Sequence, residues 1–559
     1  MSSTIALERP RKRGSSPFKP KGRQVEDSAA KEIRKLLGDR PRSHDLLIEF
    51  LHLIQDTYNH LSAAHLAALA REMKLAMTEV YEVATFYHHF DVIKEDQLAP
   101  AKITVRVCDG ISCEMKGAKS LLKNLLERYS SSNNARIIHA PCVGACDQAP
   151  VAVVGQRQIH HAEINDVVSN ITNSNTKADL PNYIHYEDYL ANGGYEIWKA
   201  CRDGDLERDQ IIESVDQSGL RGLGGAGFPT ARKWGFLKNT PKPRLVAINA
   251  DEGEPGTFKD RHCLETDPHR ILEGILIAAW AVEADAAYIY LRDEYPQCRA
   301  LLLDEIDRLT AEGMTGNIQL HLRRGAGAYI CGEESAMLES IEGKRGLPRN
   351  RPPFPAQEGL FRRPTLINNV ETMFWLRDIV TNGPNWYQEQ GRPHFYSVSG
   401  RVKDPGVKLA PAGVTVNQLI NQYSGGMEDG HIFKAYLPGG ASGGILPAGE
   451  SDLPLDFGSL DEYGCFIGSS AVVIFSDHDN IRSICHNLVS FFEYESCGQC
   501  TPCRVGCEKM LKLIQNPHWD KKLIGELSTA MRDASICGLG QAAPNPVESA
   551  LRFFAEEVA

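Results

Sequence analysis

The sequence lacks any apolar run long enough to cross a bilayer. Its best candidate, Ile275–Val282, follows Glu273 and is far shorter than the roughly 18 residues that a span needs. The N-terminus lacks the apolar stretch of a secretory signal. With a net charge of −11, the chain also lacks the positive excess of a general nucleic-acid binder. We therefore expect a cytoplasmic protein that binds neither membrane nor nucleic acid.

Cysteine is plentiful, in contrast to these absences. The chain has 15 cysteines in 559 residues, and without an export signal they are expected to stay reduced. Their clustering favours metal ligation over disulfides. The length predicts three to four domains, and the 42% hydrophobic and 24% charged content is ordinary for a globular protein.

The glycine-rich stretch Gly219–Trp234 is the first candidate site. Its glycines let backbone N–H groups approach a phosphorylated ligand, and Lys233 can meet the ligand's charge. A glycine-rich surface turn is the alternative. A second polar stretch, Ile248–Arg261, follows the predicted strand Leu245–Ile248. Loops at the carboxyl ends of α/β strands bind ligands, so the two stretches together predict a nucleotide or flavin site.

Three further stretches continue this region: Arg324–Glu334, Gly343–Pro355 and Pro364–Thr372. The prolines of the second fix an extended path, in which Phe354 can stack on a flat ring. Asn368 and Asn369 offer amide groups suited to a phosphate or to the edge of a flavin.

The N-terminal part has two characters. Met1–Val25 is basic, without apolar periodicity, and is predicted to be an unstructured arm that either straps onto an acidic partner or is merely solvated. Asp45–Phe90 has helical spacing, with Ser62 as a predicted N-cap, and indicates a small helical bundle.

Two cysteine pairs then follow two predicted strands, Ile103–Val107 and Ala135–His139, with the helix Leu121–Tyr129 between them. The C-x4-C and C-x3-C spacings favour a [2Fe–2S] cluster on spread-out loops. Zinc is the alternative, but neither pair has the C-x2-C spacing usual in at least one half of a zinc site. The segment resembles the thioredoxin-like [2Fe–2S] subunit of complex I, and the four expected ligands are Cys108, Cys113, Cys142 and Cys146.

The C-terminal motif SCGQCTPCR is the sharpest single signal. A C-x2-C-x2-C triplet followed by one distant cysteine is typical of a [4Fe–4S] cluster, with a four-thiolate zinc site as the alternative. The predicted ligands are Cys497, Cys500, Cys503 and Cys537. The remaining cysteines are expected to be packed thiols: Cys201, Cys263, Cys298, Cys331, Cys465, Cys485 and Cys507.

Motif by motif, the flavin region resembles the NADH-oxidising flavoprotein subunit of complex I and the matching subunits of NAD-linked hydrogenases and formate dehydrogenases. The resemblance implies no catalytic side chain, since hydride passes between cofactors. It implies FMN binding by Gly222, Gly224, Gly225, Lys233, Asn249, Asp251, Glu252, Tyr329, Gly332, Glu333, Asn368, Asn369 and Thr372. For NAD(H) it implies Phe228, Phe236, Glu254, Glu334, Arg351 and Phe354.

The resemblance also bears on the choice between NAD and NADP and on one further domain, an insert after the flavin region. The family often has lysine where this sequence has Arg351, which keeps the charge but leaves the contact open. Glu254 and Glu334 near the ribose would repel a 2′-phosphate, which implies NAD over NADP. Tyr396–Ile474 resembles the family's ubiquitin-like β-grasp insert. Within it, Gly439–Gly444 is expected to be a structural turn, since no helix start or lysine follows, with a phosphate loop as the alternative.

We therefore expect a multidomain α/β and α+β protein with a helical lead-in, a thioredoxin-like [2Fe–2S] domain, an α/β FMN- and NAD-binding domain, a β-grasp insert and a C-terminal helical bundle with a [4Fe–4S] cluster. The predicted boundaries are 1–27 (basic arm), 28–98 (helical bundle), 99–175 (thioredoxin-like), 176–210 (linker), 211–392 (FMN and NAD), 393–476 (β-grasp) and 477–559 (helical [4Fe–4S]).

The resemblance implies a diaphorase, an NAD-dependent oxidoreductase subunit that exchanges electrons with a partner. In the family, fused hydrogenase versions often lack some of the N-terminal cluster cysteines, whereas this chain has all four. The favoured assignment is therefore the β subunit of a formate dehydrogenase. Its α subunit would hold a molybdenum or tungsten pterin and further clusters, from which electrons reach [4Fe–4S], FMN and NAD+. A diaphorase subunit of an NAD-reducing [NiFe] hydrogenase, or another complex I-like module, is the alternative. A non-catalytic zinc scaffold is a third reading, and it would hold no flavin.

Overall fold

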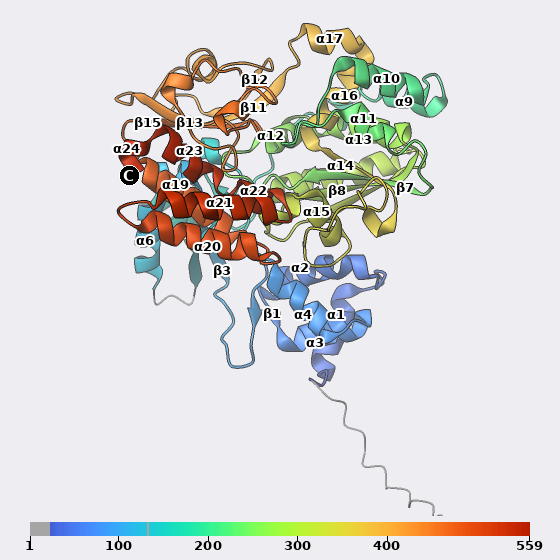
Figure 1. Cartoon of the computed structure of the whole chain (residues 1–559). Helices are drawn as coiled ribbons and strands as arrows, with labels where there is room; N and C mark the ends of the chain where they lie inside the picture. Colours follow the sequence, from blue (N-terminus) through green and yellow to red (C-terminus); the bar gives the residue numbers. More distant parts are fainter. Residues whose placement is uncertain (1–22, 131–133, 559) are drawn as a thin grey trace, which may run out of the picture.

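The computed structural model describes residues 23–130 and 134–558, which contain four β-sheets and the helices around them (Figure 1). The basic arm predicted at the N-terminus lies mostly in residues 1–22, outside the described residues. Across the part of the chain that the structure describes, no helix is both long and apolar enough to cross a membrane.

The first unit is the predicted helical bundle. Ser62 caps its third helix, as expected, because the Ser62 side chain accepts a hydrogen bond from the backbone N–H of His65 at 3.1 Å. Two short parallel strands close the unit. Its elements are α1 (Asp27–Leu37), η1 (His44–Leu46), α2 (Leu47–Tyr58), β1 (Leu61–Ser62), α3 (Ala63–Met73), α4 (Met77–Phe86) and β2 (Val92–Ile93).

The second unit is the thioredoxin-like domain. Its strand order is β4-β3-β5-β6, with β3 and β4 parallel and the other pairs antiparallel. Both predicted strands and the helix between them are present, each within a few residues of the expected ends. The elements are β3 (Ile103–Cys108), α5 (Ile111–Met115), α6 (Ala118–Tyr129), β4 (Ala135–Ala140), η2 (Cys146–Gln148), β5 (Ala152–Val154), β6 (Arg157–Ile159) and α7 (Ile164–Thr172).

The third unit is a parallel sheet of order β10-β7-β8-β9 with helices on both faces. Its strands are β7 (Arg244–Ala250), β8 (Ala284–Leu291), β9 (Gln319–Arg324) and β10 (Thr365–Asn369). Its helices are α10 (Arg208–Ser218), α11 (Thr230–Gly235), α12 (Lys259–Thr266), α13 (Pro268–Ala281), α14 (Pro296–Ala311), η3 (Tyr329–Gly332), α15 (Glu334–Ile341), η4 (Leu360–Arg362), α16 (Val370–Asn382) and α17 (Pro384–Glu389).

The stretch predicted as a linker with a helical approach, residues 176–210, packs against the third unit. This stretch contains α8 (Tyr186–Ala191) and α9 (Glu196–Asp203) and belongs to the core of the third unit. Glu273 of α13 is fully buried, and it accepts hydrogen bonds from Tyr189 Oη at 2.6 Å and from the backbone of Tyr195 at 2.9 Å. Because a buried carboxylate must be satisfied by such partners, these helices are a structural part of the domain and not a spacer.

The fourth unit is the predicted β-grasp insert, a mixed sheet of order β12-β11-β15-β13-β14. Its elements are β11 (His394–Gly400), β12 (Gly406–Ala410), α18 (Val416–Gln418), η5 (Leu419–Tyr423), β13 (Phe433–Leu437), β14 (Leu446–Pro447), η6 (Ala448–Glu450), η7 (Asp461–Tyr463) and β15 (Ala471–Ser476). The C-terminal helices follow: α19 (Ile481–Tyr494), α20 (Thr501–Gln515), α21 (Lys521–Ala534), α22 (Gly538–Ala542), α23 (Asn545–Phe553) and α24 (Ala555–Val558).

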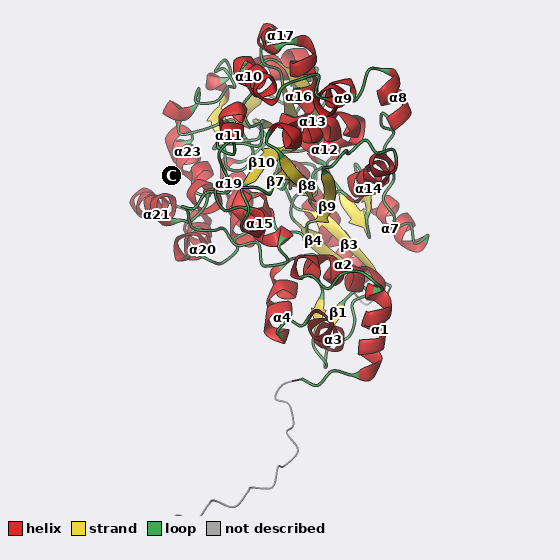
Figure 2. Cartoon of the chain, turned by 90° about the vertical axis from the view of Figure 1, so that its right-hand side faces the viewer, coloured by secondary structure: helices red, strands yellow, loops and turns green. Residues whose placement is uncertain are grey.

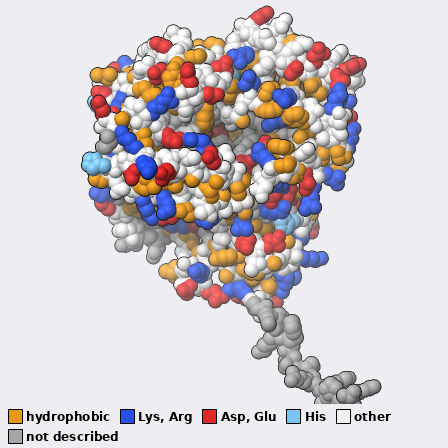
Figure 3. Space-filling model, viewed as in Figure 1, with side chains coloured by type: hydrophobic (Ala, Val, Ile, Leu, Met, Phe, Trp, Pro, Cys, Tyr) orange, Lys and Arg blue, Asp and Glu red, His pale blue; other side chains and the backbone are white. Residues whose placement is uncertain are grey.

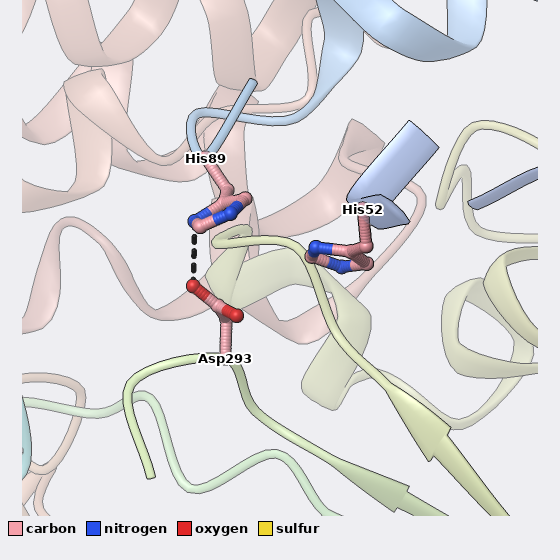
Figure 4. A group of neighbouring side chains, drawn as sticks. All are labelled: His52, His89 and Asp293. Carbon is pink, nitrogen blue, oxygen red and sulfur yellow. Dashed lines mark ion pairs between the residues drawn. The ribbon is translucent and has the colours of Figure 1, made fainter. Parts of the chain in front are cut away.

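Figures 1 and 2 both show the N-terminal helices as a lobe at one end of the molecule, joined to the edge of the third unit through α2. A buried polar network forms part of this joint (Figure 4). Asp293 accepts hydrogen bonds from Arg324 Nε and from His89 Nδ1, each at 2.6 Å, and Arg324 also binds Asp56 of α2 at 2.6 Å. Burial keeps the pKa of the neighbouring His52 well below its usual value, so His52 is neutral.

Candidate functional site

The candidate site is a cavity of about 560 Å³ at the carboxyl ends of the strands of the third unit. It lies between the loop after β7, η3, the β-grasp insert and α22. Figure 3 shows a hollow near the middle of the face seen there, between the regions of α12 and α22. A parallel sheet exposes the ends of several strands together, which explains why residues from distant stretches meet here.

Most of the residues expected to hold FMN line this cavity. Those in the lining are Gly224, Gly225, Asn249, Asp251, Glu252, Tyr329, Gly332, Glu333 and Asn369. At two of the glycines in the lining a side chain would crowd a neighbour. A Cβ on Gly224 would lie 3.0 Å from Asn369, and one on Gly253 would lie 3.0 Å from Tyr329. Glycine therefore lets the backbone pack directly against these two other residues of the lining.

The other four FMN candidates stand behind the lining and support it. Thr372 Oγ1 accepts a hydrogen bond from Leu223 N at 3.0 Å, and Gly222 N donates to Phe228 O at 2.8 Å, so both hold the glycine-rich loop in place. Lys233 Nζ donates to the carbonyl of Ile367 at 3.1 Å, and Asn368 is buried. Burial lowers the pKa of Lys233.

Of the NAD candidates, Glu254 lines the cavity and the rest lie outside its lining. The rings of Phe228 and Phe236 have centroids 6.0 Å apart. Phe236 and Phe354 are each 52% exposed, which is unusual for phenylalanine and leaves their faces open to a ligand. Arg351 pairs with Glu333 and, at 3.0 Å, with Glu334. Arg351 thus bridges two carboxylates beside the cavity and offsets one of their two negative charges.

Several lining residues could not be recognised in the sequence. Ser442 lies in the loop expected to be a structural turn, yet its backbone N–H donates to Glu254 Oε1 at 2.8 Å inside the cavity. Lys259 and Asp260 lie near the end of the polar stretch that follows β7, and the acidic residues at its start give the stronger sequence signal for a site. Nothing in the local sequence of α22 indicates that this helix lines the cavity. The additional lining residues are Ala226, Gly253, Thr257, Lys259, Asp260, Ile330, Ser442, Phe466, Ser469, Arg532, Gly538, Leu539, Gln541, Ala542 and Asn545.

Burial controls the charge of the cavity. It raises the pKa of Glu252 to about 7, helped by Asp260, and it raises the pKa of Glu254 to about 7 against the two hydrogen bonds from Ser442. Burial alone would lower the pKa of Lys259. However, Asp260 at 2.7 Å and Glu371 at 2.9 Å, with Glu252, raise it overall. The cavity therefore holds one fixed ammonium and two carboxyls that titrate near neutrality.

The four cysteines predicted for the [2Fe–2S] cluster come together at the ends of β3 and β4. All four are at most 5% exposed, and Cys142 Sγ lies 3.3 Å from Cys146 Sγ. Hydrogen bonding to Cys113 and Cys142 raises the pKa of the Cys108 thiol, whereas hydrogen bonds from Cys108 and Cys146 lower the pKa of Cys142. Thiols crowded in this way fit thiolate ligands that share one metal centre.

Two residues after β8 connect this cysteine loop to the flavin cavity. Arg292 donates to the carbonyl of Cys142 at 2.7 Å and to the carbonyl of Glu252. Tyr295 Oη donates to Glu252 Oε2 at 2.9 Å, and a Cβ on Gly144 would lie 2.2 Å from that hydroxyl. The cysteine loop is therefore seated directly against a wall of the cavity.

The four cysteines predicted for the [4Fe–4S] cluster line a second, smaller cavity. Cys503 lies in the first turn of α20, and Cys537 precedes α22, so the tight triplet and the distant cysteine meet as expected. This cavity shares Ile330 and Leu539 with the larger one. Cys507 is buried behind it and does not line it, which agrees with its expected role as a packed thiol.

Comparisons with known proteins agree with this geometry. The Nuo51 FMN-binding domain matches residues 215–378, the thioredoxin-like [2Fe–2S] ferredoxin matches residues 33–175, and the NADH-ubiquinone oxidoreductase-F iron–sulfur binding region matches residues 483–559. The F 2 subunit of the NADH-quinone oxidoreductase of Rhizobium meliloti (strain 1021) is 40% identical over 399 residues, which cover 68% of this chain and 94% of that protein. The chain belongs to the family of NADH-quinone oxidoreductase F subunits.

Other F subunits give the same result, for example that of Aquifex aeolicus (strain VF5), 39% identical over 400 residues, 68% of this chain and 92% of that protein. A chain of an NAD+-reducing [NiFe]-hydrogenase in the H2-reduced state is 32% identical, with a TM-score of 0.81 and 92% of each chain covered. This chain, a member of the F-subunit family, is thus an electron-transfer subunit of an NAD(H) oxidoreductase. It uses FMN, a [2Fe–2S] cluster and a [4Fe–4S] cluster.

Proposed function

We propose that this chain is the diaphorase subunit of a formate dehydrogenase, in which a partner subunit with a molybdenum or tungsten pterin oxidises formate and this chain reduces NAD+. The observation that carries the proposal is the convergence of Cys108, Cys113, Cys142 and Cys146 in a domain fused to the flavin cavity. In the family that the sequence resembles, fused hydrogenase versions often lack some of these cysteines. An intact set therefore favours the formate enzyme.

We infer that the residues named above hold the cofactors in the roles given there. FMN, when bound, exchanges hydride with NAD(H) and single electrons with iron–sulfur clusters. The glycine-rich loop, Asn249 and Asn369 are proposed to orient FMN, while Lys259 balances buried carboxyls. Phe228, Phe236 and Phe354 would hold NAD(H) by stacking, with Glu254 and Glu334 near its ribose. We also infer domain boundaries near residues 98, 175, 392 and 476.

The shared wall of the two cavities supports the proposed order of carriers. Ile330 and Leu539 contact both the flavin cavity and the cavity of the [4Fe–4S] cysteines. Ile536, 38% exposed, borders the cysteine cavity and opens it toward the surface. We propose that the partner subunit delivers electrons at this surface, because the cysteines here are less buried than those of the [2Fe–2S] site.

The test is purification of the native complex with a tag on this chain, followed by metal analysis and activity assays. The proposal expects molybdenum or tungsten, with NAD+ reduction that depends on formate and not on hydrogen. Nickel with hydrogen-dependent NAD+ reduction would overturn the formate assignment and leave the family membership intact. A complex that reduces quinone with NADH and contains neither metal would also overturn it.

The hydrogenase alternative rests on one specific observation. A chain of an NAD+-reducing [NiFe]-hydrogenase aligns over 92% of this chain, a share too large to leave out the whole of the fused thioredoxin-like unit. Fusion by itself therefore does not separate the two enzymes, and the metal in the native complex decides between them.

A further inference from the structure

Two histidines that the proposed function does not use lie at the outer end of the β13–β15 pair. The strands are antiparallel, with Phe433 opposite Ser476. The pairing continues one step further out, since Asp477 N donates to Ile432 O and Ile432 N donates to Asp477 Oδ1, both at 2.9 Å. The next residues outward are His431 and His478, whose ring centroids are 4.6 Å apart. The strand register therefore places two imidazoles directly across from each other.

Ser476 fixes the orientation of the first imidazole. Its hydroxyl donates to Asp479 Oδ2 at 3.1 Å and accepts from His478 N at 3.2 Å. The hydroxyl proton is thus used, so the 2.9 Å contact with His431 Nδ1 has the imidazole as donor. A proton on Nδ1 leaves Nε2 with a free lone pair. Metal-binding histidines show this same arrangement, with the second nitrogen donating to an oxygen.

Two carboxylates face the free nitrogens. Asp477 Oδ2 lies 3.9 Å from His478 Nε2, and Glu428 Oε2 lies 3.8 Å from His431 Nε2. Both separations are too long for hydrogen bonds. They suit two ligands of one ion, since each ligand sits about 2.0–2.2 Å from a zinc-like centre. Ligand atoms of His431, Asp477 and His478 all lie within 4.8 Å of one another.

We propose that His431, His478 and Asp477 form a binding site for a divalent transition-metal ion of the zinc or nickel class, with the Glu428 carboxylate beside it on the His431 side. Imidazole and carboxylate together suit these ions. The bound ion would fasten the loop before β13 to the turn between β15 and α19.

The nearby cations leave this site open. Lys116 binds the other oxygen of Glu428. The Arg401 guanidinium binds Asp479 at 2.8 Å and comes no closer than 4.0 Å to Glu428 Oε2. Glu428 Oε2 therefore keeps a lone pair for an ion on its His431 side.

The buried group of Figure 4 is a weaker candidate for a metal, although His52, His89 and Asp293 also gather there. Both oxygens of Asp293 already accept hydrogen bonds, one of them from the guanidinium of Arg324. That fixed positive charge opposes a second cation in a buried place. In the surface site, by contrast, the ion pair that Asp477 Oδ2 makes among the described residues is with the imidazole of His478.

The test titrates Zn²⁺ into the full-length holoprotein by calorimetry, with iron and flavin content measured before and after. The proposal expects one ion per chain, with binding weakened by at least about tenfold in His478→Ala and in Asp477→Asn. The matched control is His518→Ala, an exposed histidine outside the group, which should bind like the wild type. NADH–ferricyanide activity should be unchanged in all three variants, since none touches the flavin cavity.

Hydrogen exchange provides a second measurement, because zinc bound nonspecifically elsewhere on the surface would not change the exchange rates of the amides near this site. Zn²⁺ should slow exchange of the amides at 431–433 and 476–478 in the wild type and in His518→Ala, but not in His478→Ala. Equal binding by all variants would overturn the proposal. Exchange that does not respond to Zn²⁺ in the wild type would overturn it too.

Discussion

At the scale of single residues, Glu254 is the group through which pH should act on NADH. Burial raises its pKa to about 7, so it is neutral below pH 7 and negative above. The negative form repels the pyrophosphate of NADH, and we expect KM for NADH to rise by about tenfold, or 1.4 kcal/mol, between pH 6 and pH 8. In Glu254→Gln this rise should largely disappear in NADH–ferricyanide assays.

The control for this prediction is Glu389→Gln, an exposed carboxyl on α17 outside the cavity lining. It should keep the wild-type pH profile. A Glu254→Gln profile as steep as that of the wild type would assign the titration to another group, for which Glu252, with a pKa also about 7, is the first candidate.

A second prediction at this scale concerns Cys500. Because Cys500 lines the cysteine cavity that borders the flavin cavity, Cys500→Ser should abolish electron transfer to the partner while NADH still bleaches the flavin. The optical spectrum of the flavin and the EPR spectrum of the reduced [4Fe–4S] cluster separate the two events. Cys507→Ser, on the same helix α20, should keep both. Loss of flavin reduction together with the cluster would contradict the proposed order of carriers.

The cysteine groups picked out in the sequence are groups that the structure brings together. Three of the four proposed [4Fe–4S] ligands lie within SCGQCTPCR, and all four line one cavity, so local spacing was enough to select them. Ser442 was missed for the opposite reason. It reaches Glu254 across 188 positions of sequence, and no local pattern records which face of the β-grasp insert turns toward the cavity.

At the scale of elements, the turn after β4 is predicted to depend on Gly144. Its φ of +72° and the close approach of Tyr295 exclude a side chain. Gly144→Ala should displace Tyr295 and the cysteine loop and sharply reduce the EPR signal of the reduced [2Fe–2S] cluster. The matched control is Gly117→Ala, whose φ of +92° is equally unusual but whose Cβ meets nothing within 4 Å.

The control separates the effect of backbone strain from the effect of a steric clash with Tyr295. Gly117→Ala introduces only the strain of a left-handed backbone, about 1–2 kcal/mol, and should keep the cluster signal. If both variants lost it equally, backbone strain and not the contact with Tyr295 would explain the effect.

Element prediction gave bounds where apolar periodicity was long and gave none where it was short. The strand expected at Ile103–Val107 is Ile103–Cys108, and the cap at Ser62 is confirmed. The helices α8 and α9 have six and eight residues, too few to show a helical period clearly. These helices and the turn between them place aromatic side chains around the buried Glu273. Because Glu273 is distant in the sequence, no local pattern indicates this contact.

At the scale of the whole molecule, Arg324 is predicted to hold the N-terminal lobe to the flavin unit. It is 5% exposed and binds Asp293 and Asp56 at once. Arg324→Ala leaves Asp293 buried beside His89 alone, and the loss should destabilise this joint by about 3 kcal/mol. In Arg324→Ala we therefore expect faster hydrogen exchange in α2 and unchanged exchange in α20.

A half-exposed ion pair between the same lobe and the third unit supplies the comparison. Arg345 lies 3.3 Å from Glu82 of α4, and the two side chains are 44% and 55% exposed. Arg345→Ala should change α2 exchange little, since exposed pairs contribute about 0–1 kcal/mol. Equal effects of the two substitutions would mean that the buried network does not fasten the lobe.

The wall common to both cavities bears on when the cofactors can be inserted during synthesis of the protein. Ile330 is translated before Leu539 and the other α22 residues of the lining. A nascent chain that has not yet reached α22 has a flavin pocket open on one side and is short of Cys537. We therefore expect capture of the flavin and insertion of the iron–sulfur cluster to wait for the same stretch of synthesis.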